Sequence, residues 1–222
     1  MESVLDRVIK QNTENVNLLK TKDYNIFSVL QIQSKEVLIC RMIADLLNPR
    51  GQHGAGAEYL KIFLKDCLGM EKMDTKLADQ AIVTAEYAID DERRIDIVIE
   101  IGSHFLPIEV KIYAADQKNQ CFDYYQYAKR RDAQAKVYYL TLDGHRPGKD
   151  STSSGSQSVP EEDIVCLSFR EHILNWLKAC KNCENTGMIP ILEQFIRNIE
   201  QISGYTSERV RNMVIDELLT SG

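Results

Sequence analysis

The spacing of hydrophobic residues changes from a helical to a strand-like period along the chain. Apolar residues three and four positions apart predict early helices at about residues 2–20, 35–48 and 60–68. We expect Ser34 to cap the second of these helices and Gly69 to end the third. From residue 81 apolar and polar residues alternate, which predicts strands at 82–89, 93–101 and 106–113.

The second half of the chain returns to mostly helical patterns. We expect Asp116 to cap a helix that runs to about Arg131, followed by a fourth strand at 136–142. Residues 143–163 are polar and rich in Gly, Ser and Pro, which predicts a mobile loop. The remaining predictions are a short strand at 164–167, a helix opened by a capping box at Ser168 and Glu171, and helices at about 190–203 and 207–219. The element order is that of an α/β protein.

Charged residues interrupt two of the predicted strands, between residues 93 and 111. Asp96 lies on the first of these strands, and Glu109 and Lys111 lie on the second. Because side chains alternate across a strand, Glu109 and Lys111 share one face. Burying two acids and a lysine on one side of a sheet is unfavourable unless the charges have a purpose.

These residue types suit a site for a hard divalent cation. The carboxylates of Asp96 and Glu109 are oxygen ligands of the kind that Mg²⁺ or Mn²⁺ binds, and the backbone carbonyl of Val110 can supply a third oxygen. Lys111 can orient or deprotonate a water molecule, or neutralise charge that develops on a phosphate. The pattern therefore predicts hydrolysis of a phosphodiester by in-line attack.

The segments 94–96 (RID) and 108–111 (IEVK), set in this order of elements, resemble the PD-(D/E)XK nuclease superfamily. The resemblance implies a restriction-endonuclease-like αβββαβ core, with a mixed central sheet flanked by helices and with extra N- and C-terminal helices. It also implies that Asp96 and Glu109 bind the metal and that Lys111 assists the nucleophile.

Further residues extend the resemblance. Gln120 and Tyr124 lie one helical turn apart and resemble the Q-x-x-x-Y motif of RecB-like members, which implies that they act beside the metal site. Glu36 matches the position of an additional acidic residue and is a further candidate metal ligand. Ile95 stands where the motif name has a proline, a departure that many members tolerate. Together with LLNPRGQHG and IEVKIYAADQKNQ, the run 30–145 looks like an uncharacterised bacterial branch of the superfamily.

Composition narrows the class of protein. With 222 residues, of which 44% are hydrophobic and 27% charged, we expect a single domain over 1–222, with its core at about 30–145 and a helical extension at about 164–220. The chain shows no apolar run of the roughly 18–20 residues that span a bilayer, and its charged start is unlike a signal peptide, so we expect a cytoplasmic protein with reduced cysteines. The net charge of −6 does not exclude a local basic groove.

Other residues could join the site, and each has a structural alternative. Gln117 could reach the same cleft, and Glu86 is a further candidate ligand. His53 could contact metal or phosphate, or it could simply form a turn. Glu100 is expected to be solvated. Basic side chains could contact phosphates or be ordinary surface charges: Arg93, Arg94, Lys118, Lys129, Arg130 and Arg131. Tyrosine side chains could stack on bases or pack in the core: Tyr124, Tyr125, Tyr127, Tyr138 and Tyr139.

The predicted function is that of a Mg²⁺- or Mn²⁺-dependent nuclease that hydrolyses phosphodiester bonds in DNA rather than RNA. The resemblance implies a role in restriction, repair or defence. One alternative is a catalytically silent module of the same fold that binds nucleic acid or a protein. Another is a helical interaction protein, because the apolar terminal helices would permit a homodimer. Contact with a membrane is not expected.

Overall fold

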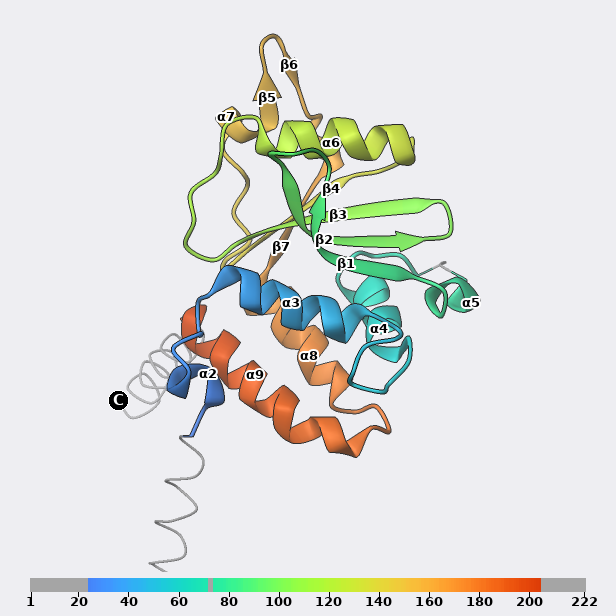
Figure 1. The fold of residues 1–222 in the computed structure, drawn as a ribbon, viewed down its shortest axis with the longest axis vertical. Helices are drawn as coiled ribbons and strands as arrows, with labels where there is room; N and C mark the ends of the chain where they lie inside the picture. Colours follow the sequence, from blue (N-terminus) through green and yellow to red (C-terminus); the bar gives the residue numbers. More distant parts are fainter. Residues whose placement is uncertain (1–23, 72–73, 205–222) are drawn as a thin grey trace, which may run out of the picture.

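A mixed β-sheet forms the centre of the molecule in the computed structural model, which describes residues 24–71 and 74–204 (Figure 1). The helices predicted at 2–20 and 207–219 lie outside these residues. The sheet has five strands in the order β1-β2-β3-β4-β7. The strands are β1 (Ile82–Ala88), β2 (Arg94–Ile101), β3 (His104–Lys111), β4 (Val137–Thr141) and β7 (Ile164–Ser168).

The direction of the strands changes in the middle of the sheet. β1, β2 and β3 pair antiparallel, whereas β3, β4 and β7 pair parallel. β2 and β3 form a hairpin whose turn contains Gly102 at φ +59°, a left-handed conformation that glycine adopts without steric cost. The parallel pair β3–β4 needs a crossover, which the helix α6 (Gln120–Arg131) supplies. The predicted α/β class with a mixed, helix-flanked sheet is confirmed.

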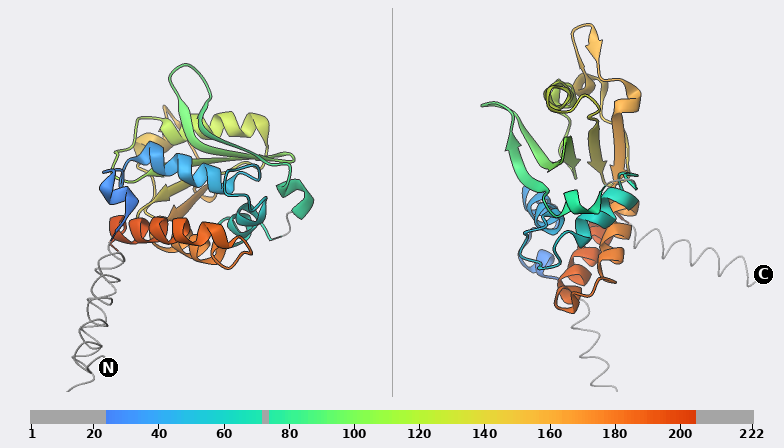
Figure 2. Two further views of the ribbon diagram at one scale, coloured as in Figure 1. Left: turned by 60° about the horizontal axis from the view of Figure 1, so that its bottom comes forward. Right: turned by 90° about the vertical axis from the view of Figure 1, so that its right-hand side faces the viewer.

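Helices cover both faces of the sheet (Figure 2). α6 covers one face, and a larger group covers the other: α3 (Glu36–Leu47), α4 (Glu58–Asp66), α8 (Leu174–Cys180) and α9 (Ile189–Ile202). α8 and α9 share a hydrophobic core with α3, α4 and the sheet. The short helices α2 (Ile26–Val29) and α5 (Thr75–Ala78) complete this side. None of the described helices is long and apolar enough to cross a membrane.

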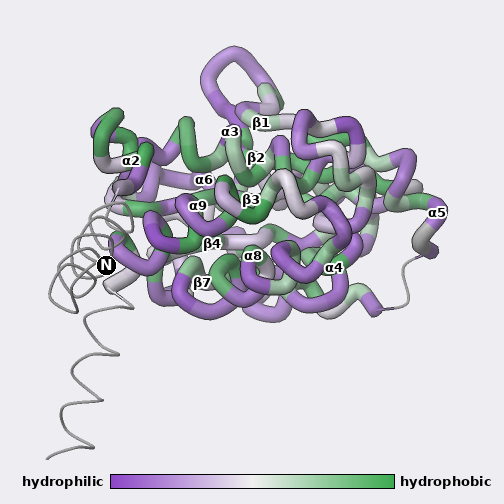
Figure 3. The backbone as a smooth tube through the Cα atoms, turned by 90° about the horizontal axis from the view of Figure 1, so that it is seen from below, coloured by the Kyte–Doolittle hydropathy of each residue, from purple (hydrophilic) through white to green (hydrophobic). Residues whose placement is uncertain are grey.

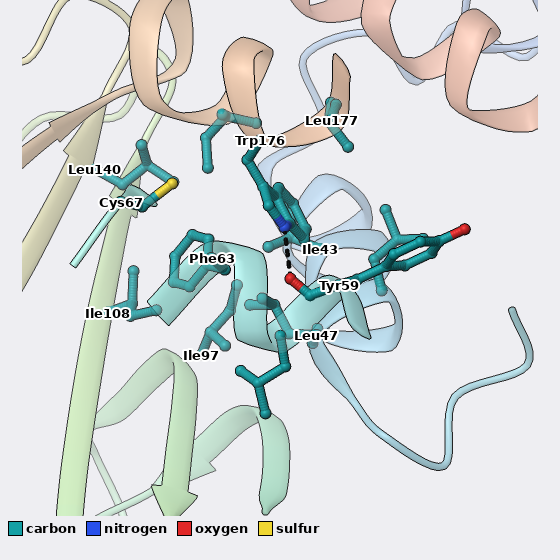
Figure 4. Close-up of a cluster of buried hydrophobic side chains, with 14 of the residues drawn as sticks. Ile43, Leu47, Tyr59, Phe63, Cys67, Ile97, Ile108, Leu140, Trp176 and Leu177 are labelled. Carbon is teal, nitrogen blue, oxygen red and sulfur yellow. Dashed lines mark hydrogen bonds between the residues drawn. The ribbon is translucent and has the colours of Figure 1, made fainter. Parts of the chain in front are cut away.

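The larger core is built around Trp176 of α8 (Figure 4). Its indole Nε1 donates a hydrogen bond to the carbonyl of Tyr59 over 2.8 Å, so the one polar atom of this buried ring has a partner. The ring packs edge-on against Phe63, with centroids 5.3 Å apart. These contacts lock α8 onto α4 and hold both helices against Ile97 and Ile108 of the sheet.

The polar segment 143–163 contains short regular elements where the sequence predicts a loop. They are α7 (Lys149–Thr152), the strand pair β5 (Ser153–Ser154) and β6 (Gln157–Ser158), and a 3₁₀ turn (Glu161–Asp163). Ser151 Oγ accepts from the backbone N–H of Cys121 over 3.3 Å, and the Asp150 carbonyl accepts from the N–H of Asn119 over 2.7 Å. The segment therefore supplies partners for two backbone N–H groups at the amino end of α6.

Two predicted helix caps are wrong, and a third is confirmed. α6 begins at Gln120, and Asp116 instead accepts hydrogen bonds from the Tyr139 hydroxyl over 2.6 Å and from the Gly148 N–H over 2.7 Å. α3 begins after Lys35 without a side-chain cap, so Ser34 does not cap it. Ser168 does cap the helical turn Phe169–Ile173, because its Oγ accepts from the Glu171 N–H over 3.1 Å. The reciprocal half of the predicted capping box is wrong, because the Ser168 N–H donates to His172 Nδ1 over 3.1 Å and not to Glu171.

Candidate active site

The candidate site lies where β2 separates from β3. Paired residues run from Ile101 and His104 to Ile97 and Ile108, and the ladder ends there. The next residue of β2 is Asp96, whose Oδ2 accepts a hydrogen bond from the backbone N–H of Val110 over 2.8 Å. The Asp96 side chain thus replaces a backbone hydrogen bond of the ladder. The Val110 N–H of β3 keeps a partner, and the two strands can diverge.

The side-chain alternation of β2 also changes at Asp96. Ile97 and Ile99 pack in the core beneath α3 and α4, whereas Ile95, which strict alternation would place with them, packs in the core beneath α6. On the neighbouring strand, Glu86 has a left-handed backbone with φ +54°. The regular geometry of the sheet is therefore interrupted beside Asp96, a distortion of the kind that often accompanies functional sites.

Glu109 and Lys111 form a buried ion pair on β3. The Lys111 Nζ lies 2.5 Å from Glu109 Oε1, and the side chains are only 7% and 1% exposed, respectively. The two residues share a face, as predicted. The second carboxylate oxygen, Glu109 Oε2, is buried and has no hydrogen-bond partner. A buried oxygen of this kind is costly to leave unsatisfied, so it indicates a place for a ligand.

Burial and crowding raise the pKa values of the acidic groups. Burial raises the pKa of Asp96 to about 6, although the Val110 N–H and the charge of Lys111 oppose the rise. The pKa of Glu109 is raised well above its usual value by burial and by the charge of Asp96. For Lys111, burial acts to lower the pKa, but the charge of Glu109 outweighs it and the pKa is raised. Lys111 is therefore a cation at neutral pH.

The arrangement of oxygen atoms fits a hard divalent cation. Asp96 and Glu109 supply carboxylate oxygens, the unpartnered Glu109 Oε2 among them, and the Val110 carbonyl lies on the strand between Glu109 and Lys111. Across the described ranges no three His, Cys, Asp or Glu side chains make a ready cage for an ion. Mg²⁺ commonly takes one or two carboxylates and completes its coordination with water and substrate phosphate.

Glu36 reaches the same strand from α3. Its Oε2 accepts a hydrogen bond from the backbone N–H of Ile112 over 2.8 Å, directly after Lys111. Its charge raises the pKa of both Asp96 and Lys111, so it is close enough to belong to the same cluster. The structure thus brings Glu36 to the site, while its role as a metal ligand stays a prediction.

Gln120 and Tyr124 lie on α6 and are connected by hydrogen bonds to the strand that carries Asp96. The Tyr124 hydroxyl donates a hydrogen bond to the Arg94 carbonyl over 2.5 Å, and Gln120 Nε2 donates to the Tyr124 oxygen over 3.1 Å. Both side chains are buried. Because Arg94 is two residues before Asp96, the pair fixes the strand that carries the acid.

A comparison of the sequence with protein-family models identifies the family of the chain. A family model of the PD-(D/E)XK nuclease superfamily matches residues 24–197. The chain belongs to the PD-(D/E)XK nuclease superfamily. Nucleases of this superfamily generally use divalent metal ions. No curated protein and no solved structure shows significant similarity to the chain.

Tyr124→Phe tests the support that α6 gives to this PD-(D/E)XK site. Loss of the two hydrogen bonds of the hydroxyl is expected to lower the free energy of unfolding by about 1 kcal/mol and nuclease activity by about tenfold. Tyr127→Phe is the matched control on the same helix, because its hydroxyl bonds to Tyr87, away from the acids. The control should lose stability alone. Equal activity in the two variants, measured by cleavage rate, would contradict the assignment.

His53 has a structural role in the PD-(D/E)XK chain. Its Nε2 donates to the Asn48 carbonyl over 2.9 Å, while its Nδ1 accepts from the Ala55 N–H over 3.0 Å. The ring stacks on Tyr59 with centroids 4.8 Å apart and is buried. Both ring nitrogens are thus used within the loop, which supports the interpretation of His53 as a turn residue.

Half of the six basic candidates for phosphate contact form ion pairs within the chain: Arg93, Lys129 and Arg131. Lys129 pairs with Asp163 over 3.2 Å, and Arg131 pairs with Glu100 over 2.6 Å. Arg94, Lys118 and Arg130 are exposed and stay candidates. The tyrosines Tyr124, Tyr138 and Tyr139 are buried in the core, as the structural alternative predicts.

Arg93 connects three parts of the site, a role that sequence reasoning missed. Its guanidinium donates to the Gln117 side chain over 3.0 Å and to the Lys118 carbonyl over 2.6 Å, and it pairs with Asp123 over 3.1 Å. These contacts join the start of β2 to the connection after β3 and to α6. The partners are 24 or more residues away in the sequence, so local patterns carry no signal for them.

Cys40 was also missed as part of the site. It is buried on α3, one turn after Glu36. Burial raises the pKa of its thiol, and the charges of Asp96, Glu36 and Glu109 raise it further, so it lies beside the acids as an uncharged group. The i, i+4 spacing from Glu36 was the signal available in the sequence.

Proposed function

We propose that the chain is a metal-dependent nuclease that hydrolyses phosphodiester bonds in DNA. The observation that carries the proposal is the buried pair of Glu109 and Lys111, with one carboxylate oxygen unpartnered, beside Asp96 at the point where β2 leaves β3. Such a group of buried charges reduces stability, and a role in binding and catalysis accounts for its presence.

Asp96, Glu109 and the Val110 carbonyl would hold Mg²⁺ or Mn²⁺. When bound, the cation supplies positive charge to the phosphate and lowers the pKa of water. The Val110 N–H holds Oδ2 of Asp96 in position for this role. Gln120 and Tyr124 hold the strand behind it, and Glu36 fixes the end of β3 at Ile112.

Lys111 acts as a cation in this proposal. Because Glu109 holds its pKa above the usual value, its ammonium group is poor at removing a proton at neutral pH. It is suited instead to donate hydrogen bonds to a water molecule or to a phosphate oxygen and to neutralise the negative charge that develops there. The ion pair with Glu109 fixes the position of the ammonium group beside the carboxylate.

We propose that DNA is the substrate, in restriction, repair or defence, and that the protein acts in the cytoplasm. We also propose a single domain rather than a core with a separate extension. The hydrophobic core that α8 and α9 share with α3 and α4 supports this, as does the family match, which continues to residue 197.

Removal of the metal provides the direct test. The purified protein is expected to cut plasmid DNA with Mg²⁺ or Mn²⁺ and to lose all cleavage in excess EDTA, with activity restored by added cation. A matched single-stranded RNA should be cut more slowly, as followed by gel electrophoresis. Binding of nucleic acid without cleavage under every metal condition would instead favour a catalytically silent binding module.

A further inference from the structure

A hollow of about 500 Å³ lies at the amino end of α3, beside the candidate active site. Its apolar walls are Leu30, Ile32, Val37 and Leu38, and Lys35 and Glu36 contribute polar groups. Leu30 is 58% exposed, and Val37 and Leu38 are also exposed. Figure 3 shows hydrophobic positions on α2 and at the neighbouring α3. A group of exposed apolar side chains of this kind marks an interaction site.

Glu36 joins the hollow to the catalytic strand. Glu36 is one of the residues that line the hollow, and its side chain accepts the hydrogen bond from Ile112, the residue after Lys111. A molecule in the hollow therefore contacts a residue that is bonded directly to the end of the catalytic strand. Tyr24 and Val29 are also exposed apolar residues, but they do not line the hollow.

We propose that the hollow binds a nucleobase of the substrate strand, next to the phosphodiester that is cleaved. This inference rests on the proposed nuclease function. The faces of a nucleobase are apolar and fit against Leu30, Val37 and Leu38, whereas its edges carry hydrogen-bonding groups. Lys35 offers a positive charge to the adjoining phosphate, which balances the repulsion from Glu36.

The backbone around the hollow is held in a fixed conformation. Gln31, on its lining, has a left-handed backbone with φ +55°, and its N–H donates to the Ser28 carbonyl over 3.1 Å. The connection is tied to α9, because Asn198 Nδ2 donates to the Gln33 carbonyl over 3.0 Å. A preformed surface of this kind binds a ligand without the entropic loss of ordering it.

Substrates that lack single bases test the proposal with the full-length protein. A DNA oligonucleotide with a mapped cleavage position is prepared with one abasic site at each neighbouring position, and kcat/KM is measured for each. For the wild type, one abasic position should lower kcat/KM by about tenfold, as expected for losing one buried base face. Leu30→Ser should lower kcat/KM on the intact substrate similarly and show no further loss at that position.

Val29→Ser is the matched control. Val29 is 57% exposed, against 58% for Leu30, and does not line the hollow. It should keep the wild-type rate and the wild-type response to the abasic site. Leu38→Ser, on another wall, provides a second variant and should behave as Leu30→Ser does. Thermal unfolding of all three variants is expected to match the wild type, because the side chains are exposed.

Four outcomes would overturn the inference. Cleavage by the wild type without a sensitive abasic position, or a sensitive position that responds equally in Leu30→Ser, would exclude a base in the hollow and leave the nuclease function intact. Dissociation of an oligomer by Leu30→Ser, seen by sedimentation with an unchanged abasic response, would show that a second copy covers the hollow. A wild type that cuts no nucleic acid would overturn the proposed function itself.

Discussion

Lys111→Met is expected to abolish cleavage and to destabilise the fold. The change keeps the apolar stem of the side chain but removes the ammonium group 2.5 Å from Glu109. Removing one partner of a buried ion pair leaves the other charge uncompensated, so we expect a loss of about 3 kcal/mol in the free energy of unfolding. Loss of the positioned cation should lower the cleavage rate by about 10³-fold.

Lys181→Met provides the matched control for this prediction. Lys181 forms an ion pair of similar length with Glu193, 2.7 Å, but both groups are partly exposed. A solvent-exposed pair contributes little, so the control should lose less than about 1 kcal/mol and keep full activity. Denaturant unfolding and cleavage kinetics separate the two variants. Substantial cleavage by Lys111→Met would exclude the proposed role of Lys111.

Asp96→Asn is expected to abolish cleavage while stabilising the metal-free protein. In the fold the pKa of Asp96 is raised to about 6 from its ordinary value of 3.8, mainly by burial, so the charged form is disfavoured there. An amide resembles the protonated acid and can still accept the bond from Val110. We expect a gain of about 1–3 kcal/mol in the free energy of unfolding near pH 7.

The raised pKa of Asp96 makes the stability gain of Asp96→Asn depend on pH. Because the folded pKa lies above the unfolded one, the stabilising contribution of protonated Asp96 is fully present below about pH 4 and is lost as the pH rises through about 6. The stability difference between Asp96→Asn and the wild type should therefore shrink as the pH falls from 7 to 4. Added Mg²⁺ should stabilise the wild type and not the variant.

Glu100→Gln controls for removing an acid from the same strand. Glu100 pairs with Arg131 over 2.6 Å, away from Asp96. The control is expected to keep activity and its response to Mg²⁺, and to be no more stable than the wild type. A stabilised Glu100→Gln variant would show that lower net charge, rather than the environment of Asp96, produces the gain.

Local patterns in the sequence determined most of the fold and the main residues of the candidate site. The alternation over Ile97–Ile99 and the Glu-x-Lys spacing of Glu109 and Lys111 depend on neighbours only two residues apart, and the structure places these side chains on the expected faces. The helical spacing of Gln120 and Tyr124 likewise placed them together on α6. Periodicity of this kind is a property of the backbone, so it can be read without a partner.

Only the tertiary structure decided which distant parts of the chain supply hydrogen-bond and packing partners to one another. Ser151, rather than Asp116, supplies the cap at the amino end of α6, and Ile95 leaves the face that alternation predicts. Arg93 bonds the connection after β3 instead of standing free for DNA. In each case a polar group or a strand residue is held by a partner far along the chain. The packing of helices on the sheet sets the position of that partner.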